Sequence, residues 1–417
     1  YVISQPITNH QSPITKKMSP QEQIILLSAK IHPSAGELLA LDGLVPRIVD
    51  WEALADKLIE RGFGPLFYKK TAQLANRKLI PAGSMEKLRQ SYYITLSRGT
   101  MLYDTFRKVA EAFNGHGIEV VALKGIHLAE WLYGDIGLRQ LSDIDLLVRK
   151  EDGERCLQIL TALGFRQSGD EVSHLITEKI GVVHYPAMLL GDVSVELHID
   201  LHNSRKPYRL DVNQIIGNAV PITLNHTPVK GMELHDLLLF LCVHLDKHFI
   251  SGEVQFTGFA DITNLLDMHA AGIDWQKLES SCISYNCVNN VYKYLLMAVR
   301  YFHAPVPEEV TGKYAGSLQA ADEELFSRYL NGFRPKAYGT STHLKNIAEM
   351  NSTSERIRYL LKVVFPSREF MARSYAMKHP SLFWLYYPTR HWKGLKGLWR
   401  MMKAPSTVSR FIGNSTS

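Results

Sequence analysis

Three acidic residues in the middle of this 417-residue sequence are spaced in a way that suits binding of divalent cations. Asp143 and Asp145 are two residues apart in the segment Ser-Asp-Ile-Asp-Leu-Leu-Val, and side chains two apart on a β-strand lie on the same face. Two carboxylates that point the same way repel each other unless a proton or a cation lies between them. The pair predicts a metal site, although two solvated aspartates at a strand end give the same pattern.

A second strand-like segment alternates apolar and ionisable side chains. One face has Glu196, His198 and Asp200, and the other has valine, leucine and isoleucine. A strand that faces water has the same alternation, but a neighbouring strand with its own acid pair favours a shared site with Asp143 and Asp145. Three carboxylates on adjacent strands can bridge two metal ions about 3.5 to 4 Å apart, which supports in-line displacement at phosphorus. Oxygen ligands favour Mg²⁺ or Mn²⁺ over Zn²⁺.

A candidate phosphate site lies upstream of the acid pair. The apolar segment 118–123 leads into Lys124-Gly125 and then into a helical pattern. A glycine at the beginning of a helix lets backbone N–H groups approach an anion closely. Lys124 adds charge, and Arg139, four residues before Asp143, has a guanidinium that can bind phosphate oxygens in a bidentate way. Each signal is weak alone, and their order along the chain gives them weight.

A helical segment after residue 233 contributes a second group of polar residues. His244 and His248 are four apart, a spacing that puts both on one helix face, where they could bind a metal ion with Asp261 as a third ligand. The helix is otherwise rich in leucine and phenylalanine, as in a core helix. We favour a pocket wall in which Lys247 and His248 bind the nucleotide, and a purely structural role and a metal site remain as alternatives.

The elements that must position these residues mix strands and helices. We predict strands at 118–123, 142–148, 181–190 and 193–201, and helices at 126–132 and 152–163. Gly191-Asp192 predicts a two-residue hairpin turn between the last two strands. Helices are predicted on both sides of this unit: Ser19-Pro20-Gln21-Glu22 is a capping box, Asp50-Trp51 and Asp274-Trp275 begin amphipathic runs, and a long helical pattern covers 84–114.

The composition indicates a folded protein without a membrane span. Apolar residues make up 46% of the chain and charged residues 21%, which excludes a disordered chain. The four cysteines are too scattered for a disulfide scaffold or a zinc site. No apolar stretch reaches the roughly 18 residues that a membrane span needs, and the polar segment 1–17 does not resemble a signal peptide. We therefore expect a cytoplasmic location.

The C-terminal segment has an unusual charge. Residues 355–410 contain twelve lysine or arginine residues and two acids, together with several aromatic residues, while the rest of the chain is mildly acidic. A basic, aromatic-rich segment can bind phosphates, nucleic acid or an anionic membrane surface. A solvated helical face is the equally weighted alternative.

Four motifs together resemble one known family. They are Val-Val-Ala-Leu-Lys-Gly at 120–125, Leu-Tyr-Gly-Asp at 132–135, Gly-Leu-Arg-Gln-Leu-Ser-Asp-Ile-Asp-Leu-Leu-Val at 137–148, and Val-Glu-Leu-His at 195–198. The family is the uncharacterised bacterial nucleotidyltransferase family of the DNA polymerase β superfamily, and the likeness covers roughly residues 20 to 300.

The resemblance implies an α+β fold: a polymerase β-like nucleotidyltransferase core with a mixed sheet, flanked by N-terminal and C-terminal helical regions. The division we expect is an N-terminal helical region at 18–114, the core at 115–228, a C-terminal helical domain at 229–350 and a basic, aromatic-rich helical tail at 351–417. The superfamily usually has Gly-Ser at its phosphate-binding turn, whereas this sequence has Lys124-Gly125.

The resemblance also implies the site and the reaction. Asp143, Asp145 and Glu196 become the catalytic residues that bind two Mg²⁺ or Mn²⁺ ions, and Gly125 becomes part of the phosphate-binding turn. The protein would transfer a nucleotidyl group from a nucleoside triphosphate, with ATP favoured, to a hydroxyl or phosphate of a small molecule, peptide or protein. The alternatives are a nucleotide-binding or regulatory module without turnover and an enzyme that tailors a small modified peptide.

Overall fold

The computed structural model describes residues 18–168, 184–202, 208–251, 254–332, 353–366, 368, 371 and 380–392. The chain forms two compact units, one of Tyr1–Arg166 with Met188–Pro335 and one of Gln167–Ala187 with Lys336–Ser417. The predicted four-part division stays a prediction. Among the described residues, no helix has both the length and the apolar character needed to cross a membrane.

A seven-stranded mixed sheet lies in the middle of the sequence, with strand order β3-β4-β5-β2-β1-β7-β6. Strand β2 is parallel to β5 and antiparallel to β1, and β1 is parallel to β7. The predicted α+β class with a mixed sheet is confirmed. The strands are β1 (Val121–Ala122), β2 (Ile144–Leu147), β3 (Arg166–Gln167), β4 (Met188–Leu190), β5 (Val193–His198), β6 (Val220–Leu224) and β7 (Thr227–Gly231).

The strands are shorter than the sequence pattern predicts. Strand β5 ends at His198 because the carboxylate of Asp200 accepts the backbone N–H groups of Leu201 and His202, which turns the chain. The predicted turn at Gly191-Asp192 joins β4 and β5, which pair antiparallel. Of the predicted strand 181–190, residues 181–183 lie outside the described part of the chain, and the described strand there is β4, which starts only at Met188.

The hairpin of β6 and β7 was not predicted. Its turn is formed by Asn225 and His226, whose φ angles are both positive, 45° and 62°. Two consecutive left-handed residues are the geometry of the tight turns that fit the twist of a hairpin. The sequence signal is weak because the turn lacks the glycine that usually marks it.

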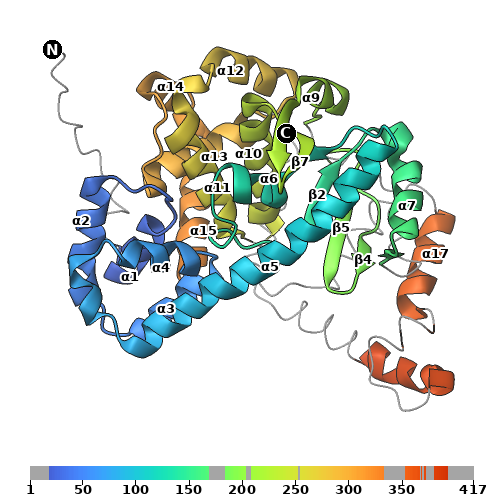
Figure 1. Ribbon diagram of the computed structural model, residues 1–417, viewed down its shortest axis with the longest axis horizontal. Helices are drawn as coiled ribbons and strands as arrows, with labels where there is room; N and C mark the ends of the chain where they lie inside the picture. Colours follow the sequence, from blue (N-terminus) through green and yellow to red (C-terminus); the bar gives the residue numbers. More distant parts are fainter. Residues whose placement is uncertain are drawn as a thin grey trace. The chain divides into compact units, whose positions relative to one another are not determined.

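Helices next to the sheet connect it to the N-terminal region. The 34-residue helix α5 (Ala82–Gly115) confirms the predicted long helix and contacts both the N-terminal helices and strands β5 and β7 (Figure 1). The capping box at Ser19 and the N-cap at Asp50 are also confirmed. The remaining helices are α1 (Pro20–Leu27), α2 (Ala35–Leu44), α3 (Trp51–Glu60), α4 (Gly64–Thr71), α6 (Lys124–Trp131), α7 (Gly153–Ala162) and α9 (Val212–Asn218).

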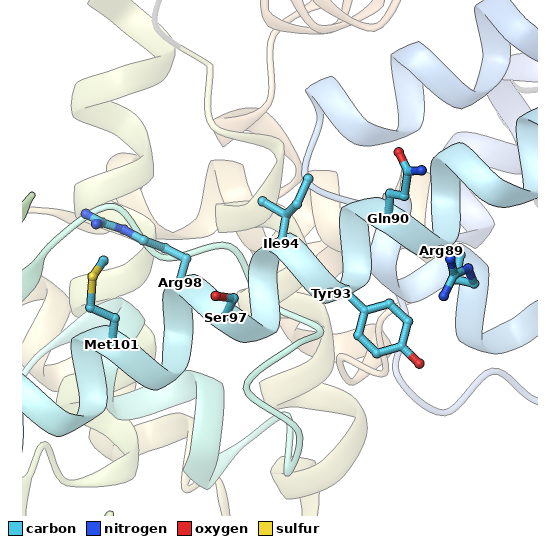
Figure 2. Close-up of a pocket in the computed structure, with 7 residues that line it drawn as sticks. All are labelled: Arg89, Gln90, Tyr93, Ile94, Ser97, Arg98 and Met101. Carbon is cyan, nitrogen blue, oxygen red and sulfur yellow. The ribbon is translucent and has the colours of Figure 1, made fainter.

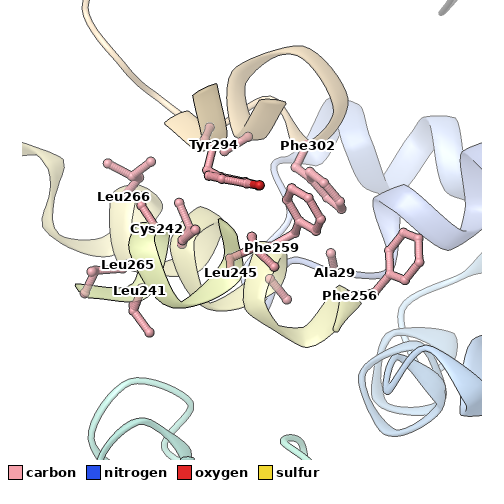
Figure 3. Packing of buried hydrophobic residues seen from close by; sticks show 14 of the residues in the cluster. Ala29, Leu241, Cys242, Leu245, Phe256, Phe259, Leu265, Leu266, Tyr294 and Phe302 are labelled. Carbon is pink, nitrogen blue, oxygen red and sulfur yellow. The ribbon is translucent and has the colours of Figure 1, made fainter. Parts of the chain in front are cut away.

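The C-terminal helices of the first unit pack around α10 (Leu234–Ser251), which has an almost entirely apolar central stretch. Figure 3 shows Leu245 of α10 close to Phe259, whose ring in turn contacts that of Tyr294. This core continues into the N-terminal helices. The other helices here are α11 (Phe256–His269), α12 (Trp275–Ser284), α13 (Val288–Phe302), α14 (Glu308–Lys313) and α15 (Ala320–Leu330). The four cysteines are free and buried.

Candidate active site

The predicted carboxylates come from two neighbouring parallel strands. In the register of β2 and β5, Asp145 lies directly opposite Glu196. Asp143 lies just before β2, and the charges of Asp145 and Glu196 both act on its carboxylate. One carboxylate oxygen of Asp145, one of Glu196 and a ring nitrogen of His198 lie within 4.8 Å of one another. The alternation read from the sequence therefore brings Asp145 and Glu196 together.

Asp145 is the most buried of these acids, with an exposed fraction of 4%. Its Oδ1 atom is 3.1 Å from Lys124 Nζ and 2.8 Å from His198 Nε2. Burial alone would raise the pKa of Asp145, but the charge of Lys124 and the hydrogen bond from His198 hold it well below its ordinary value. Asp145 is therefore ionised at neutral pH and available as a metal ligand.

Asp143 has the opposite shift. Burial and the negative charge of Asp145 raise the pKa of Asp143, and Glu196 adds to this effect. The Ser142 hydroxyl, which donates to Asp143 Oδ1 at 2.9 Å, lowers the pKa but does not cancel the rise. The cluster thus has more carboxylate charge than Lys124 compensates, and added positive charge would stabilise it.

His198 is a site residue that the predicted set omits. It is buried, and besides its bond to Asp145 its Nε2 atom is 3.8 Å from Glu196 Oε2. A signal was present in the sequence, because the alternation that selects Glu196 also puts His198 on the same face of the strand. Because Asp145 is ionised, we assign the Nε2 proton to His198, which donates it to the carboxylate and fixes its orientation.

The Lys124-Gly125 turn begins helix α6, two residues earlier than the sequence predicts. Lys124 has a φ angle of 42°, in the left-handed region that non-glycine residues rarely adopt. This strained backbone directs the side chain to Asp145. At Gly125, an added Cβ atom would lie 2.8 Å from both Arg139 Nη1 and a methyl group of Leu141. A glycine is needed here because the loop that contains Arg139 packs directly against the turn.

Arg139 lies in a buried ion pair. Its Nε and Nη2 atoms donate to the two oxygens of Asp261 on α11, at 2.8 and 2.6 Å, and Tyr133 Oη donates to Asp261 at 2.8 Å. Arg139 is 9% exposed and Asp261 is 1% exposed. The Arg139 side chain is therefore buried against Gly125, with its guanidinium bound to Asp261. Asp261 is engaged by Arg139 and is not grouped with the histidines of α10.

His244 of helix α10 is close enough to Lys124 and Asp145 for their charges to act on its ring. The ring centroids of His244 and His248 are 4.5 Å apart, with an angle of 65° between the ring planes. Burial lowers the pKa of His244 well below its ordinary value, and the charge of Lys124 lowers it further while Asp145 opposes the shift. His244 is therefore neutral at physiological pH. Lys247 is exposed and His248 half-buried on the same stretch of helix.

A surface cavity of about 670 Å³ extends along one face of α5 (Figure 2). Its described lining is Arg89, Gln90, Tyr93, Ile94, Ser97, Arg98 and Met101. Arg98 Nη2 also donates to the backbone carbonyl of Ser142 at 2.8 Å, next to Asp143. The cavity therefore adjoins the carboxylate cluster through Arg98, although none of the predicted site residues contributes to the part of its lining that the structure describes.

Comparison with known families assigns the chain to a class. A family model described as "Uncharacterised nucleotidyltransferase" matches residues 48–303, a span that includes all the acidic and basic residues of the candidate site. The chain belongs to this family. Among curated proteins no match is found.

Three solved structures are similar to part of the chain. A solution structure of the antibiotic-resistance factor ANT(2'')-Ia is 13% identical, covers 45% of this chain and 92% of that one, and has a TM-score of 0.32. A crystal structure of ANT(2'')-Ia with adenylyl-2''-tobramycin is 13% identical, with coverage of 44% and 96% and a TM-score of 0.31. An antigenic nucleotidyltransferase-like protein from Paracoccidioides brasiliensis is 16% identical, with coverage of 48% and 92% and a TM-score of 0.30.

Proposed function

We propose that this protein transfers a nucleotidyl group from a nucleoside triphosphate, with ATP as the first candidate, to a hydroxyl or phosphate of an acceptor, and releases pyrophosphate. The observation that carries the proposal is the register of β2 and β5, which sets Asp145 opposite Glu196, with Asp143 close enough for both charges to act on it. Membership of a nucleotidyltransferase family supports the same reaction class. The mixed sheet is consistent with a polymerase β-like core at residues 115–228.

The metal ligands in this proposal are Asp143, Asp145 and Glu196, which would hold two Mg²⁺ or Mn²⁺ ions. Carboxylate oxygens suit these hard cations, and the raised pKa of Asp143 reflects the surplus negative charge that a cation would offset. When bound, the ions would lower the pKa of an acceptor hydroxyl and neutralise charge on the departing pyrophosphate. His198 would hold Asp145 in a fixed orientation through its 2.8 Å hydrogen bond.

The cations and the helix start at Lys124-Gly125 would bind the triphosphate. Lys124 Nζ, now bonded to Asp145, is close enough to the cluster to turn toward a phosphate oxygen, and the first N–H groups of α6 have no partner within the helix. Lys247 and His248, which lie within about one turn of His244 on α10, would contribute from this helix. Arg139 acts as a positioning residue, because its ion pair with Asp261 fixes the loop that packs against Gly125.

Glu196 is our candidate acceptor of the proton that leaves the attacking hydroxyl. The side chain of Glu196 is 27% exposed, compared with 5% for Asp145, so an acceptor can approach Glu196 more readily. A carboxylate within hydrogen-bonding reach of the nucleophile can act as a general base.

A nucleotide-binding regulator without turnover is the second candidate. Lys124 and His198 both make polar contacts with Asp145 Oδ1, so this carboxylate has partners within the chain itself. This candidate predicts that the protein binds a nucleoside triphosphate and transfers no part of it.

The test uses ATP, GTP, CTP and UTP labelled at the α-phosphate, and separately at the γ-phosphate, incubated with the purified protein, Mg²⁺ and a cell lysate as the source of acceptor. We expect α-label in a product, none after chelation, and none with Asp145→Asn. Asp192→Asn, the same change in the exposed β4–β5 turn, is the matched control and should be fully active. Transfer of the γ-label alone would indicate phosphoryl transfer, and binding without transfer of either label would indicate the regulator.

A further inference from the structure

The second compact unit, Gln167–Ala187 with Lys336–Ser417, contains a helix with an exposed apolar stripe. Helix α17 (Thr353–Val364) has Ile357, Leu360, Leu361 and Val364 at positions i, i+3, i+4 and i+7, with exposed fractions of 53%, 42%, 55% and 37%. At 100° per residue, these four side chains fall within about 100° of the helix circumference. Tyr359, on another face, is 1% exposed. The helix is therefore packed on one side and presents a continuous apolar stripe on the other.

A second segment of the same unit also exposes large apolar side chains. It consists of the 3₁₀ helix Pro380–Tyr386 and the helical residues 387–392, drawn in red in Figure 1. Tyr387 donates to the carbonyl of Pro366 at 2.7 Å, and Arg390 donates to that of Val363 at 3.2 Å, so the segment is attached to the end of α17. We call the exposed residues of both segments the C-terminal apolar set: Ile357, Leu360, Leu361, Val364, Leu382, Trp384, Leu385 and Trp392.

Positive charge accompanies this apolar set. On the helical wheel of α17, Arg356 and Arg358 flank the apolar stripe on its two sides, and both are exposed. Residues 355–410 contain twelve cations against two acids. A second copy of this segment would bring like charges together when the apolar stripes met, which disfavours self-association. The occupant that fits is anionic and also offers an apolar interior.

A phospholipid surface meets both conditions better than a nucleic acid does. Bases stack on aromatic rings, but the aliphatic side chains Leu360, Leu361 and Val364 gain little from a sugar-phosphate backbone. At a bilayer surface, aliphatic side chains enter the acyl boundary, tryptophan rings lie at headgroup level, and arginines extend to the lipid phosphates. Helix α17 is about 18 Å long, shorter than the roughly 30 Å hydrocarbon core, so its length suits lying in the interface.

We propose that helix α17 and the segment 380–392 dock this protein reversibly on an anionic phospholipid membrane surface, with the C-terminal apolar set inserted at the acyl boundary. The inference uses observations of the second unit alone and does not depend on the proposed function. It predicts an attraction with two components: a charge component that salt weakens and an apolar component that salt leaves in place.

The test is co-sedimentation of the full chain with vesicles of phosphatidylcholine alone and of phosphatidylcholine mixed with phosphatidylglycerol. We expect binding to the mixed vesicles, weaker binding at high salt, and little binding to phosphatidylcholine alone. Leu360→Gln with Leu361→Gln should weaken binding by about tenfold or more, because it removes two inserted leucines without changing charge. Leu39→Gln with Leu79→Gln, two exposed leucines of the first unit, is the matched control and should bind like the wild type.

A second measurement covers the case in which the leucine variant fails to fold. Brominated lipids should quench the tryptophan fluorescence of the wild-type protein, and Trp384→Phe with Trp392→Phe should remove most of that quenching. Equal binding to neutral and anionic vesicles, or no binding to either, would overturn the proposal. It would also be overturned if the protein bound single-stranded RNA but not vesicles, or if it formed a dimer that the leucine variant abolished.

Discussion

Two ion pairs contact the Lys124-Gly125 turn, and they differ in charge balance. In the first, Arg139 meets Asp261 with two hydrogen bonds, and the pair has one positive and one negative charge. In the second, Lys124 meets Asp145, with two further carboxylates close by. A hydrogen-bonded ion pair whose two charges cancel stabilises the fold. A cluster with surplus charge of one sign has a reason to bind a ligand of the other sign.

The largest expected effect comes from breaking the balanced pair. Arg139→Met leaves the Asp261 carboxylate buried without its partner, which should lower the free energy of unfolding by about 3 to 5 kcal/mol in urea denaturation. The double variant Arg139→Met with Asp261→Leu removes both charges and should recover most of the loss. If the single variant lost less than about 1 kcal/mol of its free energy of unfolding, the pair would not be a major source of stability.

The unbalanced cluster should respond in activity and not in stability. Asp143→Asn should reduce transfer of the α-label by at least about a hundredfold, equivalent to roughly 2.7 kcal/mol of transition-state stabilisation. The free energy of unfolding should fall by less than about 1 kcal/mol, because the pKa of Asp143 is raised, so its negative charge does not stabilise the folded state. Parallel losses of activity and stability would show that Asp143 is as structural as Asp261.

The two regions should also differ in their effect on nucleotide binding, and a substitution at Lys124 tests this. Lys124→Ala should weaken the binding of a non-hydrolysable triphosphate by about 1.5 to 3 kcal/mol, the range for hydrogen bonds to charged groups, as measured by calorimetry. Lys150→Ala, an exposed lysine shortly after β2, is the control and should bind normally. Wild-type affinity in the Lys124 variant, with an intact circular dichroism spectrum, would mean that the phosphates bind elsewhere.

Lys70 extends the comparison to a buried lysine whose hydrogen-bond partners are backbone carbonyls. Lys70 Nζ donates to the carbonyls of Ser28 and Leu66, and burial lowers the pKa of Lys70 to about 7 despite the charge of Glu37. Above pH 7 the unfolded chain binds a proton that the folded one has released, so stability rises with pH. Relative to Lys70→Met, the wild type should gain about 1.5 kcal/mol between pH 7 and pH 8.5 in urea unfolding. Parallel pH curves would contradict this.

The sequence predicted the parts of the fold that rest on local rules. The alternation of side chains along the strands predicted that Glu196 shares a site with Asp145, and the structure places the two side by side. The capping residues Ser19 and Asp50 predicted helix starts that the structure confirms. The hairpin at Asn225-His226 was missed because its turn residues adopt positive φ angles without a glycine to indicate them.

Long-range pairing could not be read from spacing. Arg139 and Asp261 are 122 residues apart, so nothing local indicates that the arginine is taken up by an ion pair with α11. The glycine at 125 was interpreted as room for a phosphate, and the structure adds that Arg139 and Leu141 approach it from behind. His198 lies on the same strand face as Glu196, and its bond to Asp145 depends on the parallel register, which the sequence alone does not define.

The most direct test of the central claim is a crystal structure of the protein with Mn²⁺ and a non-hydrolysable triphosphate, with the manganese located by its anomalous scattering. The account predicts manganese peaks within about 2.0 to 2.4 Å of carboxylate oxygens of Asp143, Asp145 and Glu196, with the triphosphate between these ions and Lys124. Manganese and triphosphate bound elsewhere, with the Lys124–Asp145 ion pair unchanged, would contradict it.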